Sequence, residues 1–356
     1  MKEIGSEFWT GCSPHGQYGC EWIPMKGWSL LKTLSGRVAL EYVVERIKAN
    51  GVTSVYMPSY CCHTMIEPFF KHGIKVVFYD VVLSETGLKR QFDSNHGCDA
   101  VFLLDCFGHV DEETATIAKE QKVKGKTLIY DATHSIYSAF DPTDYDYVFG
   151  SYRKWMDVNC GFVATKTAID VSTQANWKQF EEYVDVRTRM FDLKSRFMNG
   201  EDVEKQQFLP LISEAEEMLE RNYPHTLPDL RSLDVLERTD LPSLIMARKN
   251  NARILMQGIM ELADERIRCF SQTMEAHDTP LFVPVWIQAD IRNDMRRYLI
   301  EHSIYCPVHW PLSDLHTISE EAKQLYQCEL SLVCDQRYDH FDMYRMVETI
   351  KNYLEK

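Results

Sequence analysis

The sequence has 356 residues, 45% hydrophobic and 26% charged, as in an average soluble protein, and its length favours a large domain plus a smaller one. The formal net charge is −14, and lysine and arginine never form a run of five, which argues against a nucleic-acid-binding surface. There is no run of eighteen apolar residues, no signal-peptide pattern and an odd number of cysteines, eleven, so we expect a cytoplasmic protein with reduced thiols and no membrane contact.

The first half of the chain alternates between helical and strand-like segments. Residues 1–30 carry Trp9, Trp22 and Trp28 without periodicity, which favours an ordered arm lying across apolar surface. A helix is predicted from the N-cap Ser35 to the stop at Asn50 and Gly51. Strands are then predicted at 54–58, 74–81, 99–108, 126–133 and 145–152, with helices through 65–70 and near 111–121. This alternation indicates βαβ units and a largely parallel sheet buried on both faces.

The second half becomes helical over 170–235, interrupted by the segment NYPHTLPDL, and a long helix over 241–264 follows. It leads into the strands LFVPVWI and LSLVCD and two amphipathic helices, which indicates a small α+β unit. We therefore predict an α/β fold, a mostly parallel mixed sheet between helices. The predicted parts are an N-terminal arm (1–30), a large domain (31–240), and a linking helix with a small C-terminal domain (241–356).

Polar side chains follow several predicted strands, and ligands of open α/β sheets bind at that edge. Asp131 ends the strand LIYD, and Lys154 follows 23 residues later after one further strand, so both are expected at this edge. Pyridoxal phosphate (PLP) needs such a pair: a lysine that forms a Schiff base with its aldehyde and a carboxylate that pairs with its ring nitrogen. By spacing alone, an ordinary salt bridge or a solvated lysine is the commoner explanation.

The segments YDATHS, SYRKW and CGF resemble the PLP-dependent aminotransferases of the DegT/DnrJ type, which have fold type I of the aspartate aminotransferase superfamily. The resemblance also includes LSGRVAL, PSYCC, CFGH and LSLVCDQRYDHFDMYRMVETI, and covers nearly all of the chain after residue 30. It implies a homodimer that uses PLP to move an amino group from an amino acid, glutamate in the leading interpretation, to a keto acceptor. Nucleotide-linked keto sugars are the usual acceptors of this family.

The resemblance also implies roles for individual residues. Lys154 matches the catalytic Schiff-base lysine, and Asp131 matches the partner of the ring nitrogen. His134 would lie near the phenolic oxygen of the ring. The cofactor phosphate would be bound by a helix start and a hydroxyl, contributed by Ser35, Gly36, Arg37 and Ser151.

Two features depart from the family pattern. Cys62 stands where relatives carry an aromatic ring that stacks on the cofactor; Tyr60 or Phe107 could replace that ring, or the thiol could pack there. The run Cys61-Cys62-His63 has no second ligand pair at zinc-like spacing, so we expect no metal. A Gly-Tyr-Asn-Tyr-Arg-like segment, with which the partner subunit usually reaches the phosphate, is missing.

Three further residues are predicted to bind substrate. Arg153 could hold a carboxylate with two hydrogen bonds, or pair with a surface acid. His309 and Trp310 share one loop of the predicted small domain and could touch substrate, or only stabilise the loop. Two alternative functions stay open. One is a PLP-dependent sugar dehydratase or other lyase, although such relatives typically carry histidine in place of the lysine, and the other is a non-catalytic partner or sensor protein.

Overall fold

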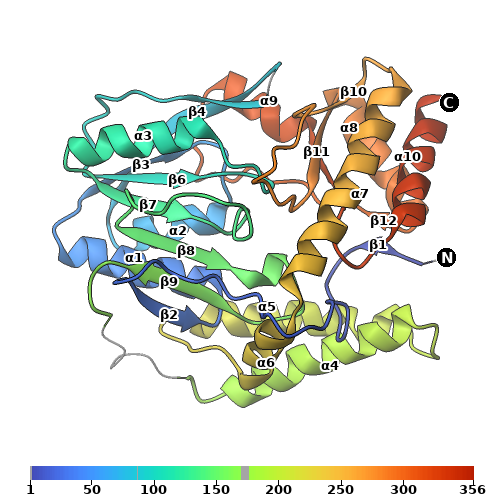
Figure 1. Cartoon of the computed structure of the whole chain (residues 1–356), viewed down its shortest axis with the longest axis horizontal. Helices are drawn as coiled ribbons and strands as arrows, with labels where there is room; N and C mark the ends of the chain where they lie inside the picture. The colour runs from blue at the N-terminus through green and yellow to red at the C-terminus, as the bar shows by residue number, and fades with distance from the viewer. Residues whose placement is uncertain (1, 86, 170–175) are drawn as a thin grey trace.

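The computed structural model describes residues 2–85, 87–169 and 176–356. Its largest sheet consists of β2 (Ser29–Thr33), β3 (Ser54–Pro58), β4 (Lys75–Ser84), β5 (Gly87–Gln91), β6 (Ala100–Leu104), β7 (Thr127–Asp131), β8 (Tyr147–Ser151) and β9 (Gly161–Thr165). The strand order is β2-β9-β8-β7-β6-β3-β4-β5 (Figure 1). This is the predicted mostly parallel α/β sheet.

The five central strands, β4, β3, β6, β7 and β8, run parallel, and β2, β5 and β9 are antiparallel to their neighbours. All five residues of β6, AVFLL, are buried, as expected for a parallel strand covered on both faces. Leu104 pairs with Asp131, and Asp131 pairs with Phe149. The carboxyl ends of β6, β7 and β8 therefore lie side by side.

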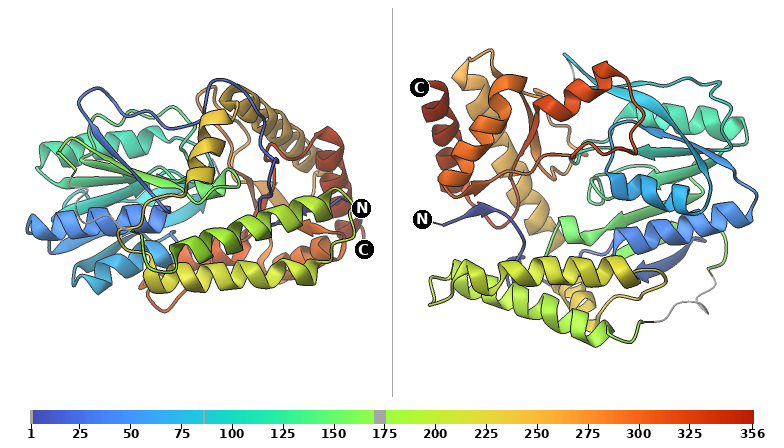
Figure 2. Two further views of the ribbon diagram at one scale, coloured as in Figure 1. Left: turned by 90° about the horizontal axis from the view of Figure 1, so that it is seen from below. Right: turned by 180° about the vertical axis from the view of Figure 1, so that it is seen from behind.

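Helices cover both faces of this sheet. One face carries α1 (Gly36–Ala49) and α2 (His63–Lys71), and the other carries α3 (Glu112–Val123) (Figure 2). The predicted cap of α1 is confirmed, because Ser35 Oγ accepts a hydrogen bond from the Val38 N–H at 3.3 Å. The helix ends at Asn50, and Gly51 follows with φ +87°, so the predicted stop is confirmed as well.

The remaining helices are α4 (Phe180–Met198), α5 (Leu209–Asn222), α6 (Leu230–Arg238), α7 (Leu241–Leu262), α8 (Ala289–Glu301), α9 (Glu320–Cys328) and α10 (His340–Leu354). Helices α7, α8 and α10 pack around a second, antiparallel sheet of β10 (Ile267–Cys269), β11 (Val283–Ile287) and β13 (Glu329–Leu332), here called the C-terminal sheet. Residues 170–175 of the predicted helical region lie outside the described residues. The predicted boundaries at residues 30 and 240 stay predictions.

The N-terminal arm joins the two halves of the molecule. Its β1 (Ile4–Gly5) pairs in parallel with β12 (Ile304–Tyr305), a pairing that the sequence did not indicate. Trp9 packs edge-on against Tyr338, with ring centroids 6.4 Å apart. Trp22 stacks on Phe162 at 5.1 Å. The arm is therefore ordered and lies on apolar surface, as predicted.

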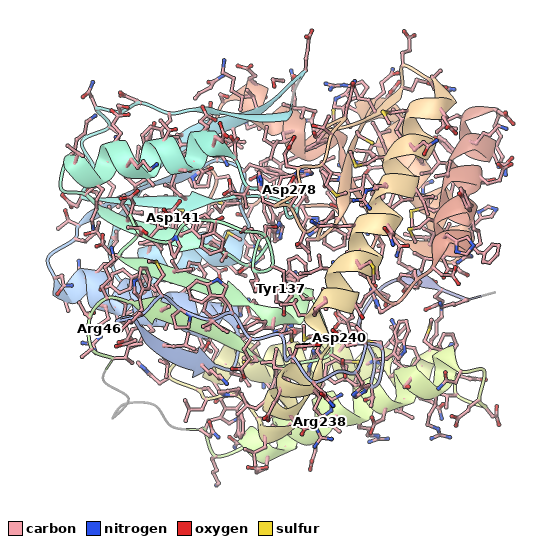
Figure 3. All side chains as sticks on the ribbon, in the orientation of Figure 1. Arg46, Tyr137, Asp141, Arg238, Asp240 and Asp278 are labelled. Atoms are coloured by element: carbon pink, nitrogen blue, oxygen red, sulfur yellow. The ribbon has the colours of Figure 1, made fainter. Side chains whose placement is uncertain are left out.

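Loops also connect the main sheet to the C-terminal sheet. Asp278 Oδ2 lies 2.8 Å from Nδ1 of His109, and Thr279 Oγ1 donates to the carbonyl of Tyr137 at 2.7 Å. Figure 3 shows Asp278 and Tyr137 between the main sheet and α7. These bonds fix the two sheets side by side. Among the described residues, no helix has the length and apolar character needed to cross a bilayer.

Candidate functional site

A cavity of about 660 Å³ lies at the carboxyl ends of β7 and β8. Its other walls include the start of α1, the arm, the loop that follows β12, and residues of α5, α7 and α8. The structure brings together nearly all of the predicted site residues on these walls: Ser35, Gly36, Arg37, Cys62, Asp131, His134, Ser151, Arg153, Lys154, His309 and Trp310. Tyr60 is the exception, since it does not line the cavity.

Asp131 is the last residue of β7 and is 3% exposed. Its Oδ1 accepts a hydrogen bond from the Thr133 N–H at 2.8 Å. This bond closes a turn that aspartate commonly forms with the backbone N–H two residues later. Burial raises the pKa of Asp131 to about 6, because the described residues bring no cation against this carboxyl group. A cationic N–H group in the cavity would stabilise the carboxylate and restore a low pKa.

Lys154 ends the short 3-10 turn Tyr152–Lys154 that follows β8. Its neighbours Tyr152 and Trp155 are buried, and the Tyr152 hydroxyl accepts a hydrogen bond from the Trp22 N–H at 2.8 Å. The Lys154 side chain itself is exposed in the cavity and forms no hydrogen bond or ion pair with any residue that the structure describes. Lys154 therefore follows a buried, hydrogen-bonded segment, and its side chain lines the cavity.

Thr133 connects the segments of Asp131 and Lys154, a role that the sequence analysis missed. Its N–H binds the Asp131 carboxylate, and its carbonyl accepts a hydrogen bond from Trp155 Nε1 at 2.8 Å. The Asp-Ala-Thr run was the only sequence signal, since it favours a turn of this kind. Thr133 thus adds a second connection between these segments, beside the pairing of β7 with β8.

Two glycines let the start of α1 approach the end of β8 and the start of β9. A Cβ atom on Gly36 would lie 2.9 Å from Ser151 Cβ, and one on Gly161 would lie 2.5 Å from the Ser35 carbonyl carbon. The free N–H groups of the first helical turn and the Ser151 hydroxyl consequently lie on one wall of the cavity. Such a helix start attracts an anionic group.

His134 is an uncharged imidazole in this site. Its Nδ1 accepts a hydrogen bond from the Phe107 N–H at 3.3 Å, so the ring hydrogen is on Nε2. Burial and, second, the positive charge of Lys154 lower the pKa of His134 to about 3. The ring of Trp310 lies 5.2 Å away.

The structure separates the three candidates for the ring-stacking position. Tyr60 packs behind Trp310 with ring centroids 5.1 Å apart, and its hydroxyl has no partner among the described residues. Phe107 also does not line the cavity, whereas Cys62 and Trp310 do. Neither aromatic side chain predicted for the stacking position lines the cavity, whereas Trp310, which the sequence predicts to touch substrate, does.

The cavity arginines differ in their availability. Arg153 is paired with Glu216 on α5, the alternative to substrate binding that the sequence left open. Arg337 is held by Asp335, with 2.7 Å between Nη2 and Oδ2. Arg296 on α8 uses Nε to bind the Cys306 carbonyl at 3.1 Å, and its terminal nitrogens have no partner in the described part of the chain. Arg296 is not among the site residues predicted from the sequence.

The sequence matches no protein-family model and no curated protein. Solved structures share its fold. NtdA from Bacillus subtilis, solved with bound cofactor PMP, has a TM-score of 0.64 and 14% identity over 92% of this chain and 73% of that chain. The sugar aminotransferase CalS13 from Micromonospora echinospora has a TM-score of 0.61 and 13% identity, with coverages of 91% and 87%.

DesI, solved in the presence of its TDP-sugar product, has a TM-score of 0.58 and 14% identity, with coverages of 98% and 94%. These likenesses span both sheets of the molecule. The chain therefore has the fold that the resemblance to the DegT/DnrJ aminotransferases implied, fold type I of the PLP-dependent transferases.

Proposed function

We propose that the protein is a PLP-dependent aminotransferase that moves an amino group from an amino-acid donor, glutamate in the first instance, to a keto acceptor. One observation supports this most. One cavity contains Lys154, which has no partner among the described residues, and the buried Asp131, whose pKa is raised. The start of α1 lies on the same cavity, at a place where two glycines leave room for it. The fold shared with NtdA, CalS13 and DesI adds support.

The residues on the cavity walls fit PLP. Asp131 would hold the protonated ring nitrogen, and the start of α1 with Ser151 would hold the phosphate. His134 would direct Nε2–H toward the ring's phenolic oxygen, and Trp310 would meet the ring. When bound, PLP supplies an aldehyde that exchanges amino groups and a ring that spreads the electron pair left at the reacting carbon. Lys154 Nζ would bond the aldehyde and later carry the proton of the donor's α-carbon.

A keto sugar bound to a nucleotide is the acceptor class that the fold neighbours favour, because DesI was solved with a TDP-sugar product. Lysine rather than histidine at position 154 favours transamination over dehydration at the same cofactor.

The proposed function is tested by mixing the purified protein and PLP with glutamate alone. We expect glutamate to convert PLP to pyridoxamine phosphate. Addition of a keto acceptor should then convert pyridoxamine phosphate back to PLP.

Two other outcomes would contradict the proposal. Loss of water from a nucleotide sugar without conversion of PLP in the presence of glutamate would indicate a dehydratase. Retention of PLP without any reaction would indicate a partner or sensor protein.

We further propose a cytoplasmic homodimer. All eleven cysteines are free thiols, which suits a reducing compartment, and exposed Tyr18 and Ile23 on the arm offer apolar surface to a partner.

Gly161→Ala is expected to weaken PLP binding about tenfold or more, because its Cβ would meet backbone atoms of Ser35 and Gly36 at 2.5 and 2.6 Å. The control is Gly258→Ala on α7, whose Cβ would meet Val347 at 2.6 Å, away from the cavity. Fluorescence titration with PLP measures both affinities, and thermal unfolding measures stability. Equal affinities in the two variants would contradict an anion site at the start of α1.

Arg296→Gln is expected to raise KM for the amino donor about tenfold to a hundredfold, because its terminal nitrogens can bind a carboxylate with charge-assisted hydrogen bonds. The neighbouring Arg297, which is exposed and bonded to Asp294 at 2.9 Å, gives the matched control Arg297→Gln. Steady-state kinetics with varied glutamate measure the effect. If Arg153→Gln raises KM and Arg296→Gln does not, Arg153 is the carboxylate anchor.

A further inference from the structure

A series of hydrogen bonds runs from a buried carboxyl group to the cavity. Glu329, the first residue of β13, is fully buried. Its Oε2 accepts a hydrogen bond from the His309 backbone N–H at 2.6 Å, and its Oε1 lies 2.5 Å from Ser331 Oγ. Ser331 Oγ is 2.8 Å from Nδ1 of His309, which lines the cavity. The carboxyl group is thus connected to the imidazole ring through one hydroxyl group.

The hydroxyl group of Ser331 has a single hydrogen, so it can donate to only one of its two neighbours. If Glu329 is ionised, the hydroxyl donates to the carboxylate, and His309 must carry its hydrogen on Nδ1. If Glu329 is protonated, the acid donates to Ser331 Oγ, the hydroxyl donates to Nδ1, and the ring hydrogen is on Nε2. The proton of Glu329 therefore decides which nitrogen of His309 carries the hydrogen.

Electrostatics favour the protonated arrangement at neutral pH. Burial raises the pKa of Glu329 to about 8, and burial, with the neighbouring His134 and Lys154, lowers the pKa of His309. The ring therefore stays uncharged and can only change tautomer. The positive charges of Arg292 and Arg296 on α8 act in the opposite direction to burial and lower the pKa of Glu329. The charge of Glu329 in turn raises the pKa values of three neighbours, Tyr60, Cys106 and Cys306.

Neighbouring rings hold the imidazole in place. Phe282 lies 4.9 Å and Phe107 5.6 Å from the ring of His309, and the side chain is almost fully buried. A change at Glu329 therefore alters the hydrogen that His309 presents and leaves the ring in its position.

We propose that Glu329 and Ser331 are positioning residues that direct Nε2–H of His309 into the cavity, where it donates a hydrogen bond to the oxygen of a carbonyl substrate. When Glu329 loses its proton, Ser331 turns its hydrogen to the carboxylate and the ring hydrogen moves from Nε2 to Nδ1. His309 then offers Nε2 as an acceptor and no longer binds a carbonyl oxygen. The effect on turnover rests on the proposed aminotransferase function, whereas the tautomer does not.

The tautomer is measured by long-range nitrogen–proton NMR on the full chain labelled with nitrogen-15 histidine, with His309→Asn to assign the signal. The wild-type signal is expected to show hydrogen on Nε2 at pH 6.5 and on Nδ1 at pH 9.5. Glu329→Gln should keep it on Nε2 throughout, since the amide accepts from the His309 N–H and donates to Ser331 as the protonated acid does. A wild-type tautomer that is unchanged between these pH values, or a Glu329→Gln signal that still changes, would overturn the proposal.

Two variants of the hydroxyl group test the connection. Ser331→Ala should remove the pH dependence of the His309 tautomer, and Ser331→Thr should keep it. Ser313→Ala is the matched control, because Ser313 Oγ lies 3.0 Å from Nδ1 of His316, a similar pair outside the cavity. A Ser331→Ala protein that behaves like the wild type would show that the carboxyl group acts without the hydroxyl group, contrary to the proposal.

Turnover provides the functional measurement. Wild-type kcat should fall about tenfold for each pH unit above pH 8 as Glu329 ionises, and Glu329→Gln should not show this decrease. The same decrease in both proteins would overturn the role of Glu329 in turnover. If the wild type has no aminotransferase activity, the proposed function fails, and the NMR result still decides between the two arrangements.

Discussion

Lys154→Ala is expected to abolish transamination, with turnover reduced about 10⁴-fold or more, because in the proposed reaction one amine would both bond the cofactor and move the proton at the donor's α-carbon. The visible absorbance of lysine-bound PLP should disappear as well. The structure gives Lys154 no competing partner among the described residues, so the change should leave the fold intact. Absorbance spectra and a glutamate half-reaction measure the two effects.

Two controls separate the chemistry of this amine from its charge and from lysine loss in general. Lys154→Arg keeps the positive charge near His134 and should be as inactive as Lys154→Ala, because a guanidinium group does not form the bond. Lys166→Ala removes an exposed lysine that donates to the Thr143 carbonyl at 2.6 Å, and it should retain activity. Wild-type spectrum and turnover in Lys154→Ala would refute the assignment.

Asp131→Asn is expected to reduce turnover about 10³-fold and to weaken PLP binding about tenfold to a hundredfold. The ring nitrogen needs a negative charge to stay protonated, and a charge-assisted hydrogen bond is lost. The matched control is Asp141→Asn, since Asp141 Oδ1 accepts from the Thr143 N–H at 2.9 Å in the same kind of turn, on the main-sheet side of the molecule (Figure 3).

The pH dependence tests the same carboxyl group. Its pKa of about 6 in the free protein means that it binds a proton as the pH falls through 6, and only the ionised form pairs with the ring nitrogen. Wild-type affinity for PLP should therefore decrease below pH 6, and this decrease should be absent in Asp131→Asn. The affinity for PLP is measured by titration between pH 5 and 8. An equal loss of affinity at low pH in the wild type and in Asp131→Asn would contradict the role of Asp131.

The sequence could predict the main sheet because its central strands are apolar runs with polar residues directly after them. Asp131 and Lys154 were found in this way, and the helix start at Ser35 followed from its capping residue. β1 and β12, of two residues each, escaped notice because they are too short to show a periodicity.

Other site residues could not be predicted from the sequence, for a different reason. Arg296 lies on an ordinary amphipathic helix, where one arginine resembles the next until the fold shows which one faces the cavity. Thr133 acts through its backbone N–H and carbonyl, which side-chain chemistry does not reveal. The sequence allows Arg153 to bind either a substrate or a surface acid, and only the position of α5 shows that it pairs with Glu216.

The pairing of β1 with β12 has a consequence for how the molecule forms. Ile4 and Ile304 are 300 residues apart, so the arm is synthesised well before β12 and stays without its partner strand until β12 has been made. The main sheet can form earlier from neighbouring segments. The arm residues Gly5–Phe8 and the loop with His309 form part of the cavity walls, so the cavity is completed after the main sheet and should be unable to hold a cofactor on a chain synthesised only as far as that sheet.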